Sequence, residues 1–244
     1  MTQSSKISKT SRMHGIKLIA RSILFVSALT MYVIGRVKKT DKAFGGYEKL
    51  IRLLAVIWLV YAIEMLLRFF PSKIESPGCQ KQFAKNYQPT GEARPRLQSW
   101  KRTLAVAAVW LMLNAAIGVL YMAEIIDEGI LVLISLAYGV CDMICILFFC
   151  PFQTWFMKNR CCTDCRIYNW DFTMMFTPYV FVPSFYTWSL LGMSLLLLLR
   201  WEITLHRHPE RFAANTNACL SCKNCSERLC SHKKQLMAFI RNKK

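Results

Sequence analysis

Four cysteines near the C-terminus are the residues whose types and spacing could most directly carry chemistry. Cys219, Cys222, Cys225 and Cys230 follow a C-x2-C-x2-C-x4-C spacing, and no apolar periodicity runs through them to indicate a packed helix. A loop of this kind can bring its thiolates together on a metal ion or an iron–sulfur cluster. The sequence therefore predicts a cofactor-binding site at these four residues.

An iron–sulfur cluster of the 4Fe–4S type is the cofactor that the spacing favours. The run typical of bacterial ferredoxins is C-x2-C-x2-C-x3-C-P, and this chain differs by one extra residue before Cys230 and by Ser231 after it. The extra residue is tolerable because the fourth ligand of a single cluster can be placed freely. Zinc, held by the same thiolates with His232 as a possible substitute, is the alternative, although zinc sites usually have two well-separated pairs of ligands. A tail without metal is the third possibility.

A second group of cysteines lies upstream, between two apolar blocks. It contains Cys150, Cys161, Cys162 and Cys165. Adjacent cysteines rarely both bind one ion, but Cys162 and Cys165 are spaced to supply two ligands. We predict a metal or redox role for this group. A thiol–disulfide pair of Cys162 with Cys165, or thiols that merely lie beside the membrane, are the alternatives.

Long apolar blocks dominate the rest of the chain. Of its 244 residues 54% are apolar, and several blocks approach the roughly 20 residues that a helix needs to cross a bilayer. We predict an all-α, polytopic helical membrane protein with about five transmembrane helices and a cysteine-rich C-terminal tail. The predicted spans are residues 16–35, 50–70, 103–121, 130–149 and 176–201. Residues 1–15 form a flexible basic N-terminus, 16–201 the transmembrane domain and 202–244 a basic, metal-binding tail.

Ionisable residues inside the spans are functional candidates, but each has a simpler structural explanation. Lys17 and Arg21 would have to extend toward the membrane surface, or else the first block lies in the membrane plane as an amphipathic helix. Glu64 and Arg68 are four residues apart and could pair on one face of the second span. Asp142 is nearer the middle of its span, and we expect it to accept a hydrogen bond from a neighbouring helix.

Five spans leave the orientation in the membrane undecided. Lysine and arginine normally collect on the cytoplasmic side, but five crossings place sixteen bases on each side of this chain. The same count puts the two cysteine groups on opposite sides, because one crossing, residues 176–201, separates them. Two helical crossings do not fit in the 31 residues from Asp171 to Trp201. We therefore expect opposite sides, the alternative being a last segment that does not cross fully.

The leading functional hypothesis is a membrane-anchored redox protein whose tail cysteines hold an iron–sulfur cluster and pass electrons to or from a partner. The alternative is thiol-based handling or transport of a soft ion such as Cu(I) or Zn(II), to which Cys141 and Cys145, one turn apart on the fourth span, could contribute. A third hypothesis is a structural subunit whose zinc-binding tail docks a partner. All four histidines lie outside the predicted spans, which excludes a bis-histidine haem within the membrane. The sequence contains no phosphate-binding loop or protease motif. Whether the protein is an enzyme is left open.

The formal net charge of +18 comes from bases that lie mainly between the apolar blocks. In a soluble protein this charge would indicate nucleic acid, but beside membrane spans lysine and arginine meet anionic headgroups. We therefore expect a lipid bilayer and a protein partner in a redox or membrane complex, and no nucleic acid. The first apolar block does not have the form of a cleavable signal peptide. We expect an integral protein of a prokaryotic cell membrane.

Overall fold

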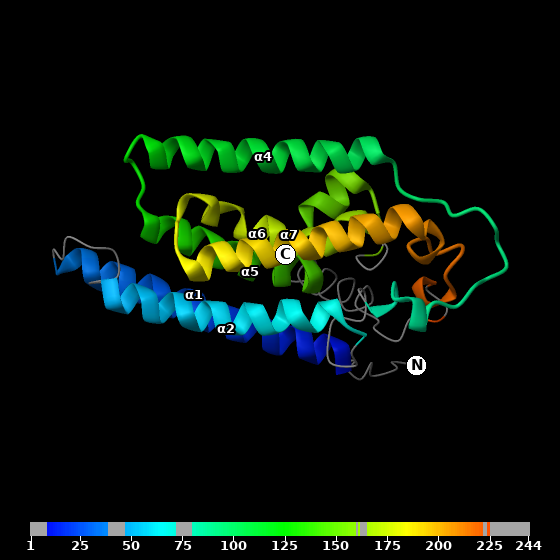
Figure 1. The fold of residues 1–244 in the computed structure, drawn as a ribbon, viewed down its shortest axis with the longest axis horizontal. Coiled ribbons are helices and arrows are strands. Elements are labelled where there is room, and N and C mark those ends of the chain that lie inside the picture. The colour runs from blue at the N-terminus through cyan, green and yellow to red at the C-terminus, as the bar shows by residue number, and fades with distance from the viewer. Residues whose placement is uncertain are drawn as a thin grey trace, which may run out of the picture.

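Helices make up all the regular structure in the part of the chain that the computed structural model describes, which is residues 9–38, 47–71, 80–159, 161, 165–221 and 224 (Figure 1). Five helices are long: α1 (Lys9–Val37), α2 (Tyr47–Phe69), α4 (Trp100–Met122), α5 (Glu128–Leu147) and α7 (Phe185–Arg207). Each of the five is long and apolar enough to cross a membrane. The prediction of an all-helical chain with five candidate spans is thereby confirmed.

Short helices lie in the connections between the long ones and after α7. They are η2 (Ala84–Asn86), η3 (Phe152–Met157), η5 (Arg166–Trp170), α6 (Asp171–Phe176), η6 (Thr177–Phe181), η7 (Pro209–Arg211) and η8 (Ala218–Leu220). The first of the long helices also extends further than predicted, because α1 begins at Lys9 rather than at residue 16.

The fifth long helix begins later than the sequence predicts. α7 starts at Phe185 rather than at residue 176, because Pro183 has no N–H group with which to continue a helix. Ser184 then caps the new helix: its hydroxyl accepts a hydrogen bond from the Thr187 N–H at 3.2 Å, and the Thr187 hydroxyl accepts one from the Ser184 N–H at 3.2 Å. Residues 176–183, predicted as the broken first part of this span, therefore belong to a different element.

That element, made of η5, α6 and η6, crosses the helical bundle on its own. At its start, the Arg166 guanidinium lies 2.7 Å from Glu202 near the end of α7. At its end, the Phe181 ring packs 6.0 Å from the ring of Tyr121 in the last turn of α4. Residues in 3₁₀ turns rise about 2.0 Å each and α-helical residues about 1.5 Å, so residues 166–181 can cover up to roughly 30 Å. We call residues 166–181 the crossing segment.

The crossing segment corrects the predicted topology. The prediction allowed one crossing after Asp171, because two regular helical crossings do not fit there. The extra pass instead begins at Arg166 and is partly 3₁₀-helical. As a result, the C-terminal ends of α5 and α7 point toward the same end of the bundle (Figure 1). The described parts of the two cysteine groups, expected on opposite sides, therefore lie at one end.

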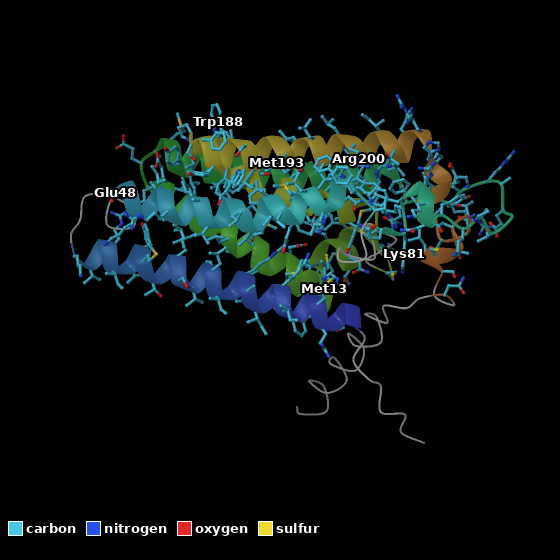
Figure 2. The ribbon with its side chains drawn as sticks, turned by 60° about the horizontal axis from the view of Figure 1, so that its bottom comes forward. Met13, Glu48, Lys81, Trp188, Met193 and Arg200 are labelled. Atoms are coloured by element: carbon cyan, nitrogen blue, oxygen red, sulfur yellow. The ribbon has the colours of Figure 1, made fainter. Side chains whose placement is uncertain are left out.

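The two ends of the bundle differ in what they carry, and we name them accordingly. The cysteine end contains the first turns of α1 and α4, the last turns of α2, α5 and α7, and residues 80–99 and 208–221 (Figure 1). The opposite end contains the end of α1, the start of α2 and the short turns before α5 and α7. In Figure 2, Met13 and Lys81 lie toward the cysteine end, and Glu48 and Trp188 toward the opposite end.

The bundle packs α1 against α5 and α2 against α7, with the crossing segment in contact with both α5 and α7. Tyr61 of α2 meets Phe176 of α6 edge to face, with ring centres 5.3 Å apart. The outer surface is apolar as well: Ile16, Ile19 and Ile23 follow one face of α1 and are 62–63% exposed. Such a continuous apolar exterior is what a helix in contact with lipid presents.

Gly139 of α5 lies directly against the Tyr61 hydroxyl of α2. A Cβ atom there would lie 2.5 Å from the Tyr61 oxygen, and Tyr61 is fully buried. We expect Gly139→Ala to lower the free energy of unfolding by about 1–3 kcal/mol, the usual cost of overpacking. Gly192→Ala in α7 is the control, because a Cβ atom there meets nothing within 4 Å. Thermal unfolding in detergent measures both, and equal melting temperatures would contradict the expected clash.

Candidate functional site

The tail begins on a folded platform made of two segments that are far apart in the sequence, residues 80–98 and 208–221. Asn217 joins them and is completely buried. Its side-chain amide donates hydrogen bonds to the Lys81 carbonyl at 3.0 Å and to the Arg211 carbonyl at 2.9 Å. Because these bonds tie both segments to one side chain, the platform has a defined structure just before the cysteine run. We call these two segments the tail platform.

Cys219 is the predicted tail ligand that falls within the described residues. Its N–H donates to the Asn217 side-chain oxygen at 3.1 Å, and its half-buried thiol donates to the Asn86 carbonyl at 3.1 Å. The other three predicted ligands lie outside the described residues: Cys222, Cys225 and Cys230. The tail platform therefore holds the first thiol of the run in place at the cysteine end.

The upstream cysteines are distributed between the end of α5 and the start of the crossing segment. Cys150 precedes η3, and its sulfur accepts a hydrogen bond from the Gln153 N–H at 3.4 Å. Cys165 directly precedes η5 and is buried. Cys161 lies on the loop between them, and Cys162 is outside the described residues.

The described residues contain no group of three His, Cys, Asp or Glu side chains that could hold a metal ion. Cys150, Cys161 and Cys165 are thus not arranged as a three-ligand set. The remaining predicted ligands belong to the part of the chain that is not described. Metal binding by either cysteine group therefore stays a prediction.

A cavity of about 130 Å³ lies between α4, α5 and the crossing segment. Four thiols line it: Cys141, Cys145, Cys150 and Cys165. The side chains of Cys145 and Cys150 are hydrogen-bonded to each other. Most of the remaining wall is apolar, and it includes the rings of Trp110 and Tyr138, whose centres are 4.7 Å apart. The fold thus brings two thiols of α5, Cys141 and Cys145, together with two of the upstream group, Cys150 and Cys165.

Cys165 lies between this cavity and the tail platform. It also lines a smaller pocket together with Gln82 and Arg96 of the platform. Nearby, Glu202 of α7 accepts hydrogen bonds from the Arg166 guanidinium at 2.7 Å and from the Trp170 indole at 2.8 Å. These contacts hold the start of the crossing segment against the end of α7, so the upstream cysteines and the platform are neighbours.

A buried arginine joins three of the long helices. The Arg21 guanidinium of α1 lies 2.6 Å from Glu64 of α2 and 2.9 Å from Asp142 of α5, and it donates to the Gly139 carbonyl at 3.0 Å. Lys17 reaches the same Glu64 at 3.7 Å. The prediction that Lys17 and Arg21 extend toward the membrane surface is therefore wrong for Arg21, which is 2% exposed. The prediction that Asp142 accepts a hydrogen bond from a neighbouring helix is confirmed.

A second buried ion pair joins α2 to the crossing segment. The guanidinium of Arg68 lies 2.7 Å from Asp171, and its carbon lies 4.4 Å from the centre of the Phe172 ring. The predicted partners Glu64 and Arg68 thus each find a partner on another element. Charges removed from water need an opposite charge close by, which these interhelical pairs supply. Asp142 and Asp171 also line the thiol cavity, so the network forms one polar part of its wall.

Considered one span at a time, the sequence did not reveal that Arg21, Glu64 and Asp142 form one network. A signal was present, because each lies in the half of its helix that is nearer the cysteine end. Comparison of this chain with protein families, with curated proteins and with solved structures finds no match in any of the three. Function must therefore be inferred from the site itself.

Proposed function

We propose that the chain is a membrane-anchored redox protein whose tail cysteines Cys219, Cys222, Cys225 and Cys230 hold an iron–sulfur cluster and exchange electrons with a partner at the cysteine end. The observation that carries this proposal is the docking of Cys219 on the tail platform. A cofactor site needs ligands on a backbone that is itself held in place. A bound cluster would supply one-electron transfer at that position.

The position of the two cysteine groups supports the proposal. Groups on opposite sides of a membrane would require an electron relay across it, and the sequence offers few residues for one. Because Cys165 borders both the thiol cavity and the pocket beside the tail platform, electrons need to enter and leave at one face only. A protein partner that docks at the cysteine end could then reach both groups.

The distribution of charge supports an orientation with the cysteine end in the cytoplasm of a prokaryotic cell. Most of the described bases gather at that end: Arg12, Lys17, Arg68, Lys81, Lys85, Arg94, Arg96, Lys101, Arg102, Lys158, Arg166, Arg200, Arg207 and Arg211. The opposite end has four described bases, Arg36, Lys38, Lys49 and Arg52, and its turn before α5 is acidic. Bases collect on the cytoplasmic side of membrane proteins, so the uneven distribution of bases that the extra pass produces supports this orientation.

Replacement of two central tail cysteines tests the proposed cofactor. We expect protein purified anaerobically in detergent to contain iron and sulfide and to absorb visible light, and the double variant Cys222→Ser/Cys225→Ser to lose all three. Cys79→Ser is the matched control, because Cys79 stands apart from both cysteine groups in the sequence. A spectrum that is the same in the double variant and in the wild type would contradict the proposal.

Soft-metal handling is the second candidate function. The observation that favours it is the cavity lined by four thiols, although no three of them form a ligand set in the described part of the chain. The wall also includes the thioethers of Met174 and Met175, which suit a soft ion such as Cu(I). The same metal analysis distinguishes the candidates. Copper or zinc in a colourless sample would favour metal handling, and zinc that is lost only with the tail cysteines would favour a structural subunit with a zinc-binding tail.

A further inference from the structure

The thiol cavity lies among the long helices and opens to their outer surface. α4 packs on the rest of the bundle chiefly through its two ends, against η3 at one end and η6 at the other. The cavity lies beside the middle of this helix, where Trp110 forms part of its wall. Cys141, which also lines it, is exposed. A small apolar molecule dissolved in the bilayer could therefore enter between α4 and α5.

Two of the cavity thiols are already in contact with each other. Cys145 lies in the last turns of α5. Cys150 lies just beyond the end of the helix and directly precedes Pro151. Their thiols are hydrogen-bonded, whereas Cys141 is fixed one helical turn away from Cys145. A disulfide needs two sulfurs that can approach to bond distance with little backbone movement. Because their thiols are in contact, Cys145 and Cys150 are the cavity thiols that we take as the oxidisable pair.

We propose that the cavity binds a membrane-soluble quinone, and that Cys145 and Cys150 form a dithiol that reduces it. In this step the two S–H bonds break and one S–S bond forms. The two electrons and two protons pass to the two carbonyl oxygens of the quinone, which leaves as the hydroquinone. The inference goes beyond the proposed function: it relies on the membrane location but needs no metal in the tail.

The wall of the cavity suits this class of ligand. A quinone ring is flat, apolar on its faces and polar at two opposite edges. The aromatic rings of Trp110 and Tyr138 offer flat apolar surface. The carboxylates of Asp142 and Asp171 lie in the same wall and are held by Arg21 and Arg68, so the polar side of the cavity is fixed in place. Because ionised carboxylates accept hydrogen bonds, that side of the wall suits the two O–H groups of the hydroquinone product.

Oxidation of the full-length protein in lipid nanodiscs tests the inference. The protein is reduced, freed of reductant and mixed anaerobically with decylubiquinone in the presence of a copper chelator. Remaining thiols are alkylated and the peptides are analysed by mass spectrometry. We expect a peptide pair linked through Cys145 and Cys150, together with an equal amount of hydroquinone. Loss of the linked pair and of the hydroquinone is expected in Cys145→Ser and in Cys150→Ser.

Two further variants separate the possible outcomes. Cys79→Ser is the matched control, because Cys79 stands apart from both cysteine groups in the sequence, and it should react as the wild type does. The tail variant Cys222→Ser/Cys225→Ser should also retain the reaction, so failure of the iron–sulfur proposal and failure of this one are distinguishable. Absence of the linked pair in the wild type, or its loss in Cys79→Ser, would overturn the assignment of the dithiol.

Ligand binding can be measured without any change to the protein. Decylubiquinol is already reduced and cannot oxidise the pair, but it should fill the same cavity. We expect it to slow the alkylation of the exposed Cys141 thiol by a maleimide, relative to nanodiscs without quinol. Alkylation at an unchanged rate would show that the cavity does not take this ligand, whether or not the serine variants fold.

Discussion

Replacement of Arg21 by alanine should destabilise the protein by about 3–5 kcal/mol, the cost that follows when one partner of a buried ion pair is removed. Glu64 and Asp142 would then face each other across the space that the guanidinium occupied, with Lys17 still 3.7 Å from Glu64. Thermal unfolding in detergent measures the effect. We expect the melting temperature to fall further for this variant than for any substitution of an exposed base.

Arg52→Ala is the matched control for this effect. Arg52 also pairs with a carboxylate, Glu48 at 3.5 Å, but the two side chains are 80% and 85% exposed. Its loss should change stability by less than about 1 kcal/mol. Adding Glu64→Gln and Asp142→Asn to the Arg21→Ala variant should recover part of the lost stability, because the unpaired charges are then gone. Equal melting temperatures for Arg21→Ala and Arg52→Ala would show that the buried network does not contribute to the stability of the fold.

Replacement of Asn217 by alanine should open the tail platform while the helical bundle stays folded. The change leaves two backbone carbonyls, those of Lys81 and Arg211, without the donor that satisfies them. A buried group that loses its hydrogen bond costs about 1–3 kcal/mol. Amide hydrogen exchange should therefore accelerate in residues 80–98 and 208–221 and stay unchanged in α5 and α7. If the tail holds a cluster, the iron content should fall as well.

Asn224→Ala is the control for the platform, because Asn224 is exposed and its side-chain amide donates to the Ala218 carbonyl at 3.2 Å rather than to a carbonyl of the other segment. Its exchange pattern should match that of the wild type. The same exchange rates in Asn217→Ala as in Asn224→Ala would mean that the platform does not depend on Asn217.

Most of the long helices could be predicted from sequence because their signal is local. A run of about 20 apolar residues forms a helix with little regard to its neighbours, and α2, α4 and α5 begin and end within a few residues of the predicted spans. The crossing segment could not be found in this way. It is shorter than a normal span, contains Asp171 and Pro178, and leads without a polar loop toward α7, so its apolar residues were assigned to the start of the next helix.

The candidate site was predictable in its residue types but not in its arrangement. The cysteines of both groups were identified from spacing alone, yet Cys141, Cys145 and Cys165 share a cavity only because the crossing segment returns beside α5. The partners of Glu64 could not be predicted from the sequence either. A partner four residues away on the same helix is visible in the sequence, whereas the choice of Arg21 depends on how α1 and α2 pack.

The buried network has a consequence for the order in which the chain can assemble during synthesis. Arg21 is made early; Glu64 follows 43 residues later and Asp142 121 residues later. Until α5 has been made, the guanidinium has only one of its two carboxylate partners, and α1 and α2 can form no more than a provisional hairpin around Glu64. The first helices therefore reach their final positions only when the second half of the chain has joined them.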